Sequence, residues 1–432
     1  IHAQSFQRLL GGYNHDNPQE IIQTYDSNYI IVGSTKSYSN GGDDIFVCKV
    51  SRQGTLIWTK TIGGSSDEQA GSIIKCSGGY ILAGTTKSYG AGNKDIFICK
   101  IDTIGNIVWT KTFGGTSEEN THEIIQTMDN NFLIVGYTYS YGKGGRDILL
   151  FKINPSGTLL WAKTYGKANN DWAHVVKELS SGSIMIAGTS FMGSHHDIVI
   201  LKTSKNGVLS WVKYFGGTSD EMAYSGSIIT GDSLIVTGRT TSYGNGNSEI
   251  LAMKLDSFGY IKWAKAYGGN KYDEGSFIRQ IPSKNIYLVG RTESYGLGKS
   301  DVIFLKLSNS GSILWSREYG GTLDEKHGAT NAYINSDNSI IIPSHSTSFN
   351  IGNGNSTDQD IYLIKTDVNG LINCNYRTAT PGTTNVTLTT GTYSLDELSQ
   401  NPTNSTHNIS STTRNIISLD IEPHIDLGAD TS

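Results

Sequence analysis

The sequence predicts an all-β fold, a seven-bladed β-propeller built from four-stranded antiparallel blades. One phrase, Leu56–Gly64 (LIWTKTIGG), recurs along the chain, and its tryptophan returns every 50 to 52 residues. The six copies of the phrase that carry tryptophan contain Trp58, Trp109, Trp161, Trp211, Trp263 and Trp315. A degenerate copy at Ser5–Gly12 (SFQRLLGG) makes seven. A fixed period near fifty residues without helical periodicity is typical of propeller blades.

Each repeat divides into four short segments of strand length. In the third repeat we expect strands at residues 123–127, 131–136, 147–152 and 159–164. These segments are rich in β-branched and aromatic residues, and turn residues such as Asp129–Asn130 and Ser156–Gly157 separate them. Their nearly continuous apolar character indicates strands that are covered on both faces by neighbouring sheets.

The blade count rests on the third strand, which begins with an acidic residue in every repeat. Those acids are Asp44, Asp95, Asp147, Asp197, Glu249, Asp301 and Asp360. The seventh repeat has no Trp-x-Lys phrase, because Gly370 is followed by Leu371–Cys374. We therefore expect the N-terminal segment to supply the outer strand of blade seven, with Phe6–Leu10 antiparallel to Ile361–Lys365. Such closure leaves no open first or last repeat.

Three regions follow from these patterns. Residues 1–4 look like the end of a signal peptide, since a small residue stands at the expected cleavage point. Residues 5–374 form the propeller. Residues 375–432 are rich in Thr, Ser and Asn, which predicts a linker with strands at 384–388 and 416–421 and a short helical turn at 394–398. The ending, residues 425–432, resembles the first strand of a further module.

Composition narrows the classes of function. The net charge is −5 and only 17% of residues are charged, so neither nucleic acid nor an anionic membrane is indicated as a partner. No apolar run reaches the length that spans a bilayer. Cys48 and Cys99 read as buried thiols, while the disulfide state of the four cysteines, Cys76 and Cys374 included, stays open. The sequence contains no cofactor motif. It also offers no metal-ligand set, because the adjacent His195 and His196 should point to opposite sides of a strand and so cannot share an ion.

The repeated phrase, read as Gly-x-x-x-Trp-x-Lys-x-(Tyr/Phe)-Gly-Gly, resembles the β-propeller repeats of secreted proteins in the Bacteroidota. The resemblance covers residues 5–374. It implies export, as in type IX secretion cargo, an extracellular or cell-surface location, and Ig-like or PKD-like modules after the propeller. It also implies an adhesin-like role, and it brings no catalytic residues with it.

Two recurrent features gather on the face that carries the loops between the second and third strands, here called the upper face. The first is an acidic ring, four residues after each Gly-Gly mark. Its members are Asp16, Glu68, Glu119, Asp171, Glu221, Asp273 and Glu325. We favour turn capping or pairing with the recurrent lysines over the alternative, a ring that attracts cations.

The second feature is a set of loop aromatics. They are Tyr38, Tyr89, Tyr141, Phe191, Tyr243, Tyr295 and Phe349. Such rings can stack on sugars, but they more often fill space between blades with their polar tips in water.

Three adjacent repeats depart from the pattern seven positions after the Gly-Gly mark. They carry His122, His174 and Tyr224, where the others have Gln19, Gly71, Ser276 and Gly328. Repetition explains what all blades share, but not what three neighbours share. We therefore expect a polar pocket beside blades three to five for a sugar or a small polar ligand. The alternative is that these residues fill the channel mouth and hydrogen-bond to water.

Three functions compete on this evidence. The sequence favours a non-enzymatic module, structural or adhesive, within a larger secreted protein, with surface glycans or other surface proteins as partners. The alternative is a multivalent, lectin-like propeller that uses the loop aromatics. A propeller-hosted hydrolase or lyase is less favoured, since we find no catalytic constellation. The ligand and the assembly state are left open.

Overall fold

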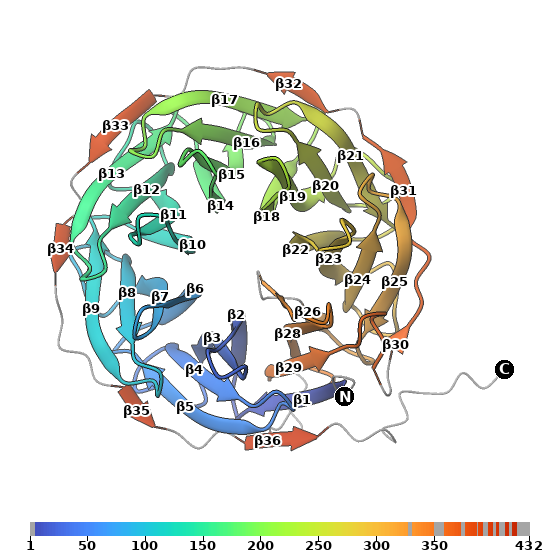
Figure 1. Cartoon of the computed structure of the whole chain (residues 1–432), viewed down its shortest axis with the longest axis horizontal. Coiled ribbons are helices and arrows are strands. Elements are labelled where there is room, and N and C mark those ends of the chain that lie inside the picture. Colours follow the sequence, from blue (N-terminus) through green and yellow to red (C-terminus); the bar gives the residue numbers. More distant parts are fainter. Residues whose placement is uncertain are drawn as a thin grey trace.

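The computed structural model describes residues 5–326, 331–349, 358–372, 376–386, 388–391, 396–400, 403–405, 411–413 and 417–420. These residues form a closed ring of seven antiparallel blades around a central opening (Figure 1). The predicted seven-bladed propeller is confirmed. The described residues contain no helix that is long and apolar enough to cross a membrane.

Four strands form each blade, from the centre outwards. Blade one contains β2 (Asp16–Gln23), β3 (Tyr29–Thr35), β4 (Asp44–Val50) and β5 (Leu56–Ile62). Blade two contains β6 (Glu68–Cys76), β7 (Gly79–Thr86), β8 (Asp95–Ile101) and β9 (Ile107–Gly114). Blade three contains β10 (Glu119–Gln126), β11 (Phe132–Thr138), β12 (Asp147–Ile153) and β13 (Leu159–Gly166). Blade four contains β14 (Asp171–Glu178), β15 (Ile184–Phe191), β16 (His196–Thr203) and β17 (Leu209–Gly216).

The remaining blades follow the same plan. Blade five contains β18 (Glu221–Ile229), β19 (Ser233–Thr240), β20 (Glu249–Leu255) and β21 (Ile261–Gly268). Blade six contains β22 (Asp273–Gln280), β23 (Ile286–Thr292), β24 (Asp301–Leu307) and β25 (Ile313–Tyr319). In blade seven two short strands, β26 (Glu325–Lys326) and β27 (Tyr333–Ile334), both pair with β28 and share the innermost position. They are followed outwards by β28 (Ile340–Ser346), β29 (Asp360–Lys365) and β1 (Phe6–Gly11).

The ring closes through β1, as the sequence predicts. This strand pairs antiparallel with β29, with Phe6 opposite Lys365 and Leu10 opposite Ile361. Leu9 and Leu10 are buried in the closing blade. Since β1 is the first strand of the chain and β29 lies in its last repeat, the two ends of the propeller are held in one sheet.

A ring-on-glycine contact repeats at every junction between blades. The fourth-strand aromatic of one blade lies over a turn glycine of the next, and Trp58 over Gly105 is an example. Gly105 has φ +86°, and a Cβ built on it would lie 2.8 Å from Cη2 of Trp58. Only glycine satisfies both the positive φ and the closeness of the ring. At the closing junction Phe6 takes the place of tryptophan, over Gly54.

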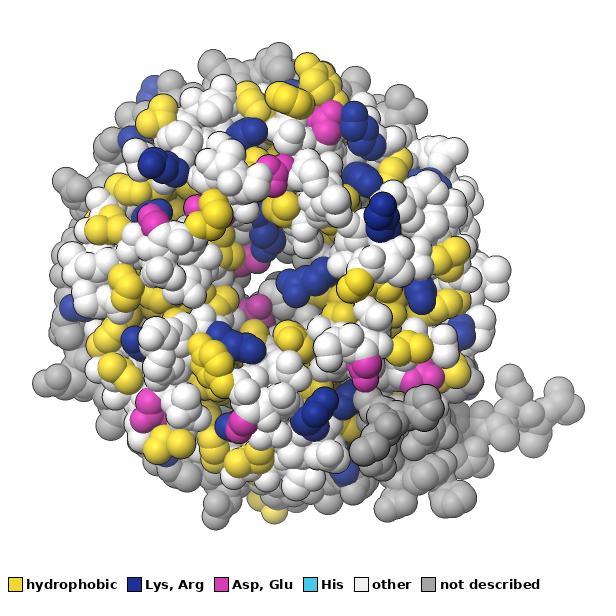
Figure 2. Space-filling model, in the orientation of Figure 1, with side chains coloured by type: hydrophobic (Ala, Val, Ile, Leu, Met, Phe, Trp, Pro, Cys, Tyr) yellow, Lys and Arg dark blue, Asp and Glu magenta, His cyan; other side chains and the backbone are white. Residues whose placement is uncertain are grey.

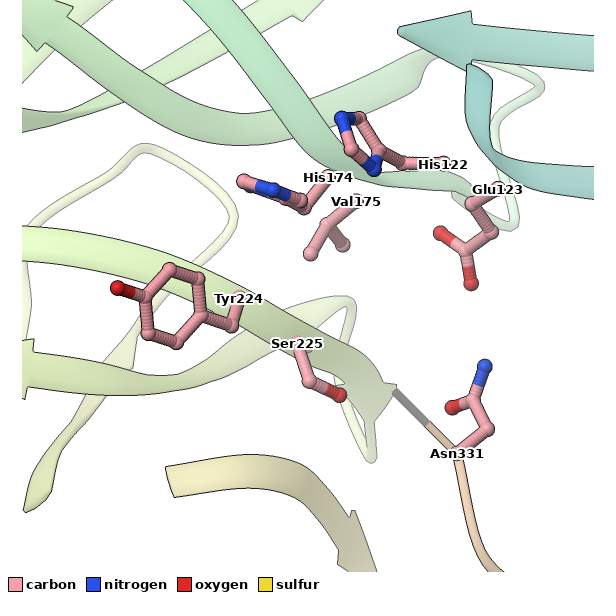
Figure 3. A pocket seen from close by; sticks show the side chains of 8 residues that line it. His122, Glu123, His174, Val175, Tyr224, Ser225 and Asn331 are labelled. Atoms are coloured by element: carbon pink, nitrogen blue, oxygen red, sulfur yellow. The ribbon is translucent and has the colours of Figure 1, made fainter. Parts of the chain in front are cut away.

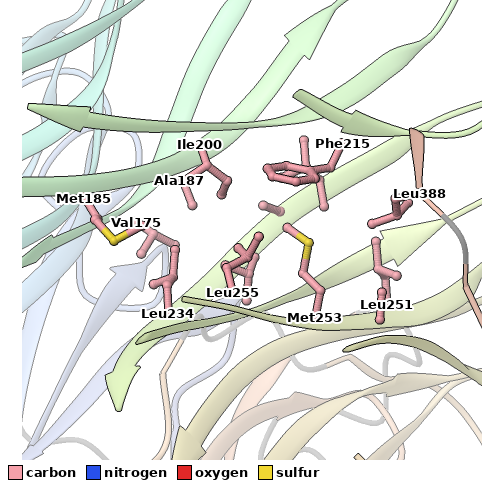
Figure 4. Close-up of a cluster of buried hydrophobic side chains, with 14 of the residues drawn as sticks. Val175, Met185, Ala187, Ile200, Phe215, Leu234, Leu251, Met253, Leu255 and Leu388 are labelled. Carbon is pink, nitrogen blue, oxygen red and sulfur yellow. The ribbon is translucent and has the colours of Figure 1, made fainter. Parts of the chain in front are cut away.

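Apolar clusters between neighbouring sheets form the core. The cluster between blades four and five includes Val175 and Met185 on one side and Leu234 and Met253 on the other (Figure 4). Because both faces of most strands are covered in this way, the strands read as continuous apolar runs. Cys48, Cys76 and Cys99 are buried thiols in this core, and burial raises the pKa of each.

The C-terminal segment forms an outer belt, β30 to β36, that adds a fifth strand to each blade (Figure 1). It runs against the order of the blades, from blade six round to blade one and then to blade seven. The belt strands are β30 (Tyr376–Arg377), β31 (Gly382–Asn385), β32 (Thr389–Gly391), β33 (Asp396–Gln400), β34 (Thr403–Ser405), β35 (Ser411–Thr413) and β36 (Ile417–Asp420). Their partners in that order are β25, β21, β17, β13, β9, β5 and β1.

The belt corrects what we expected of this segment. Residues that were predicted as a linker are paired with the blades, and the helical turn expected at 394–398 is wrong because β33 covers 396–400. The strand expected at 416–421 is confirmed as β36, and β31 overlaps the one expected at 384–388. Cys374, the signal-peptide remnant at residues 1–4 and the module start at residues 425–432 lie outside the described residues.

Candidate functional site

The three exceptional residues of the repeat occupy one kind of backbone position. In blades one to six the pairing of the innermost strand skips a residue, which marks a β-bulge at the same place each time. The skipped residues are Gln19, Gly71, His122, His174, Tyr224 and Ser276. Their counterpart in blade seven, Gly328, lies outside the described residues. A bulge re-aims the side chain of the extra residue, and these bulges lie on the innermost strands, which surround the central opening (Figure 1).

The structure brings His122, His174 and Tyr224 together as a row along three blades. The ring centroids of His122 and His174 lie 4.1 Å apart, and those of His174 and Tyr224 lie 5.6 Å apart in an edge-to-face arrangement. The row borders a shallow hollow, whose free space is about 270 Å³ when the open solvent at its mouth is included (Figure 3). Glu123 and Asn331 lie on its other side. Asn331 belongs to blade seven, and the repeat pattern gives no sign that this residue reaches the pocket.

Burial sets the protonation of the row at neutral pH. Burial lowers the pKa of His174 to about 4. Burial, followed by the charge of the neighbouring His174, lowers the pKa of His122 well below its usual value. Burial also raises the pKa of Tyr224 to about 12. At pH 7 the site therefore presents two neutral imidazoles and one protonated phenol, which can both accept and donate protons.

A second, larger hollow adjoins the first at His122. It measures about 650 Å³, including space open to solvent, and it runs along blades one to three. Its lining is rich in amides and hydroxyls, among them Gln19, Gln69, Asn120 and Thr85. The polar surface therefore extends beyond the predicted pocket, over blades one to five.

Two carboxylates that directly follow bulge residues, Glu20 and Glu123, have structural partners. Glu20 accepts hydrogen bonds from the Ile73 N–H (2.7 Å) and from the Asn331 amide (2.8 Å). Glu123 accepts one from the Val176 N–H (2.7 Å) and pairs with Lys177. Burial raises the pKa of Glu20 to about 7. Each carboxylate follows a bulge and accepts a hydrogen bond from a backbone N–H of the next blade. Our sequence analysis missed this role.

Cations and aromatic rings lie beside the row on the upper face. At blades three and four the guanidinium of Arg146 lies 5.0 Å from the ring centroid of Tyr137 and 5.1 Å from that of Trp172. At blades five and six Arg239 lies 5.7 Å and Arg291 lies 5.1 Å from the ring centroid of Tyr272. On the side shown in Figure 2, basic and acidic side chains likewise border the central opening.

The acidic ring is buried in the structure. All seven side chains are at most 1% exposed, and each accepts a hydrogen bond from a backbone N–H near the end of the preceding blade. Glu119 is representative, since it accepts from the Gly115 N–H (2.7 Å) and from the Thr138 hydroxyl (2.6 Å). This arrangement ties one blade to the next and leaves no exposed ring of charge at these positions.

The loop aromatics also bridge blades. The hydroxyl groups of Tyr38, Tyr141 and Tyr295 donate to glycine carbonyls of the preceding blade at 3.0, 3.1 and 2.9 Å. Phe349 is buried against the ring of Tyr362, with centroids 5.3 Å apart. Tyr89, Tyr243 and Phe191 are half-buried.

No metal-binding cluster is found among the described residues, where no three His, Cys, Asp or Glu side chains come together suitably. His195 and His196 have different partners. His196 Nδ1 lies 2.9 Å from Asp220, whereas His195 Nε2 lies 3.4 Å from Asp197.

Comparison with known proteins finds similarity in structure but none in sequence. No protein family and no curated protein matches the sequence. Among solved structures, the polysaccharide lyase Uly1 is 7% identical over 82% of this chain and 90% of its own (TM-score 0.47). The α-L-arabinofuranosidase Arb93A of Fusarium graminearum is 7% identical over 85% and 98% (TM-score 0.44). Sqt1 of Chaetomium thermophilum is 10% identical over 85% and 97% (TM-score 0.38).

These structures correct one sequence-based prediction. We expected a protein that is not an enzyme, because the repeats carry no recognisable catalytic constellation. A polysaccharide lyase and an arabinofuranosidase stand among the similar structures, so that expectation is contradicted. At such low identity these similarities identify neither a substrate nor catalytic residues for this chain.

Proposed function

We propose that this propeller binds a polysaccharide at its central opening, in the two hollows that meet at His122. The observation that carries the proposal is the row of His122, His174 and Tyr224 on three consecutive bulges. Sugar sites combine ring faces, which stack on the pyranose or furanose, with amides and hydroxyls that bond its oxygens. The neighbouring Gln69 and Asn120 provide such amides.

One asymmetric site fits the contacts better than seven equivalent ones. A multivalent lectin would use the loop aromatics, but the hydroxyls of Tyr38, Tyr141 and Tyr295 are engaged with the preceding blade. The row, in contrast, is confined to blades three to five among the bulges that the structure describes.

A panel of immobilised polysaccharides tests the proposal. We expect the double change His122→Ala and His174→Ala to weaken binding at least about tenfold, the effect of losing roughly 1.4 kcal/mol of contact. Ser276→Ala is the matched control, because Ser276 occupies the same bulge in blade six. Binding that survives the double change, or that falls equally in the control, would remove the row from the site.

Cleavage of the bound polysaccharide is the second candidate. The specific observation is a neutral imidazole beside a protonated phenol, which provides a proton acceptor and a proton donor at pH 7. Tyr224→Phe keeps the ring and removes its proton, so we expect it to abolish product formation while binding persists. Reducing ends and unsaturated sugars are the products to measure. If no bound polysaccharide yields either product, cleavage is rejected and the binding proposal stands.

We also propose that the protein acts outside the cell, as an adhesive or glycan-directed part of a larger secreted protein. The support is the resemblance of its repeated phrase to propellers of secreted Bacteroidota proteins. Fractionation of the producing cells tests this location. Recovery of the protein in the cytosolic fraction alone would contradict it.

A further inference from the structure

We propose that the polysaccharide is anionic, and that Arg146, between blades three and four, and Arg239, between blades five and six, bind its carboxylate or sulfate groups beside the row. This inference rests on the binding site proposed above and names the class of its ligand. It comes from a comparison of the arginines on the upper face. Arg291 has acidic partners, whereas Arg146 and Arg239 form no ion pair with the described residues.

Arg146 is held by aromatic rings and by no carboxylate. Besides Tyr137 and Trp172, its guanidinium lies 5.6 Å from the ring centroid of Tyr139, and its Nε donates to the Tyr139 hydroxyl (2.8 Å). No acidic side chain of the described part of the chain pairs with it within 4.0 Å. A guanidinium carries five N–H donors, so most of its donors are available for a ligand. Its charge reaches the row, where it helps to keep His122 neutral.

Arg239 and Arg291 occupy the same position in neighbouring blades but have different partners. In blade six Arg291 stands opposite Glu274 in the sheet, pairs with Glu293, and lies 4.0 Å from Glu274. In blade five Arg239 stands opposite Met222 instead. It donates to Met222 Sδ and to the Tyr272 hydroxyl, both at 3.3 Å. Thus Arg291 is neutralised within the protein, and Arg239 has no ion pair among the described residues.

Acids near Arg239 already have other partners. Glu274 and Asp220 act on its charge from a greater distance. Glu274 accepts a hydrogen bond from Tyr272 (2.7 Å), and Asp220 is bound by His196 (2.9 Å). A half-buried guanidinium without a counter-ion favours an incoming anion. Carboxylate and sulfate each offer two neighbouring acceptor oxygens, which match its paired N–H donors.

Arg146 and Arg239 also lie beside different parts of the row. Arg146 adjoins blades three and four, next to His122, while Arg239 adjoins Tyr224 and blade six. A saccharide over the row would therefore pass two cations, one near His122 and one near Tyr224. A polymer that bears several anionic groups along its length would satisfy both at once.

Three probes test the inference in the intact protein: polygalacturonate, dextran sulfate and neutral dextran. We expect wild-type protein to bind at least one of the two anionic polymers in preference to dextran, and less tightly as salt rises. Binding to polygalacturonate identifies carboxylate as the recognised group, and binding to dextran sulfate identifies sulfate. Arg146→Gln and Arg239→Gln should each weaken that binding about tenfold.

Two controls separate specific contacts from net charge. Lys143→Gln removes the same charge from the loop that precedes Arg146, and Arg291→Gln removes the arginine that already has partners; each should change affinity less than about threefold. Thermal melting of every variant confirms folding. Two results would overturn this inference and leave the proposed binding site intact. The first is an affinity for the anionic polymers that neither arginine change alters. The second is tighter binding of dextran that depends on His122 and His174. Failure of a wider neutral and anionic panel to bind at all would instead reject the proposed function and this inference with it.

Discussion

Phe6 lies over Gly54 of the following blade, in the position that tryptophan takes at the other six junctions. A Cβ built on Gly54 would lie 2.7 Å from Cε2 of the phenyl ring. The first strand of the chain therefore reproduces the junction of a complete repeat, although its sequence matches that repeat only in part. Closure of the ring depends on this one strand and on its pairing with β29.

We expect Leu10→Ala in the closing strand to lower the free energy of unfolding by about 2–5 kcal/mol, the usual result of truncating a buried leucine. Leu10 is 0% exposed. Ile57→Ala is the control, because Ile57 lies in the corresponding strand of blade one and is 47% exposed. Denaturant titration measures both variants. Equal losses in the two would contradict closure by β1.

The ring-on-glycine junction gives a second prediction. Gly157 has φ +80°, and a Cβ there would lie 3.0 Å from Trp109, so Gly157→Ala combines backbone strain with a clash. Gly182 has nearly the same φ, +79°, but its nearest neighbour would be 3.9 Å away. We expect Gly182→Ala to cost about 1–2 kcal/mol and Gly157→Ala about 1–3 kcal/mol more. Denaturant titration of both variants checks this, and equal costs would mean that the ring yields without penalty.

The propeller could be predicted because each blade is specified locally. Each stretch of about fifty residues contains its own strand-length segments, turn residues and tryptophan, so the signals for one blade are local in the sequence. The incomplete seventh repeat indicates where the N-terminal strand pairs. The belt could not be predicted in this way. Its strands are short and polar, as in Thr389–Gly391, and each pairs with a blade that is distant in sequence.

The candidate site was predictable only in part, for a related reason. His122, His174 and Tyr224 are visible as exceptions to a repeat. The difference between Arg239 and Arg291 is not, since it depends on which residue stands across the strand, Met222 or Glu274. Asn331 reaches Glu20 from the opposite end of the repeats, a contact that only ring closure creates.

The belt predicts what truncation should do. A chain that ends at residue 372 loses all seven belt strands and exposes the edge of every blade, so we expect lower stability and self-association through those edges. Hydrogen exchange should quicken in β13, whose residues Ala162–Gly166 pair with β33. A chain that ends at residue 420 keeps all the belt strands and serves as control. Unchanged exchange and a monomeric 372-residue chain would show that the belt pairing contributes nothing in solution.

Asp301 gives a pH dependence whose sign can be worked out. Its carboxyl is 1% exposed and adjoins Glu325, and burial, followed by that neighbouring charge, raises its pKa to about 8. In the unfolded chain the same group ionises near pH 4. Between these values the folded state holds a proton that the unfolded state has lost, so stability falls as pH rises. Glu20 and Glu318, each with a pKa raised to about 7, act in the same direction.

The informative window lies between about pH 6.5 and pH 8, because the lowered pKa values of His122 and His174 have the opposite effect at more acidic pH. Over this window Asp301 alone should cost roughly 2 kcal/mol of unfolding free energy, at 1.36 kcal/mol for each pH unit. Asp301→Asn retains the neutral form at every pH, so its stability should fall less steeply than that of the wild type and exceed it most at pH 8. Denaturant titrations at several pH values measure the two slopes. Parallel slopes would mean that Asp301 is already ionised at pH 6.5 and that the buried carboxyl pair holds no extra proton.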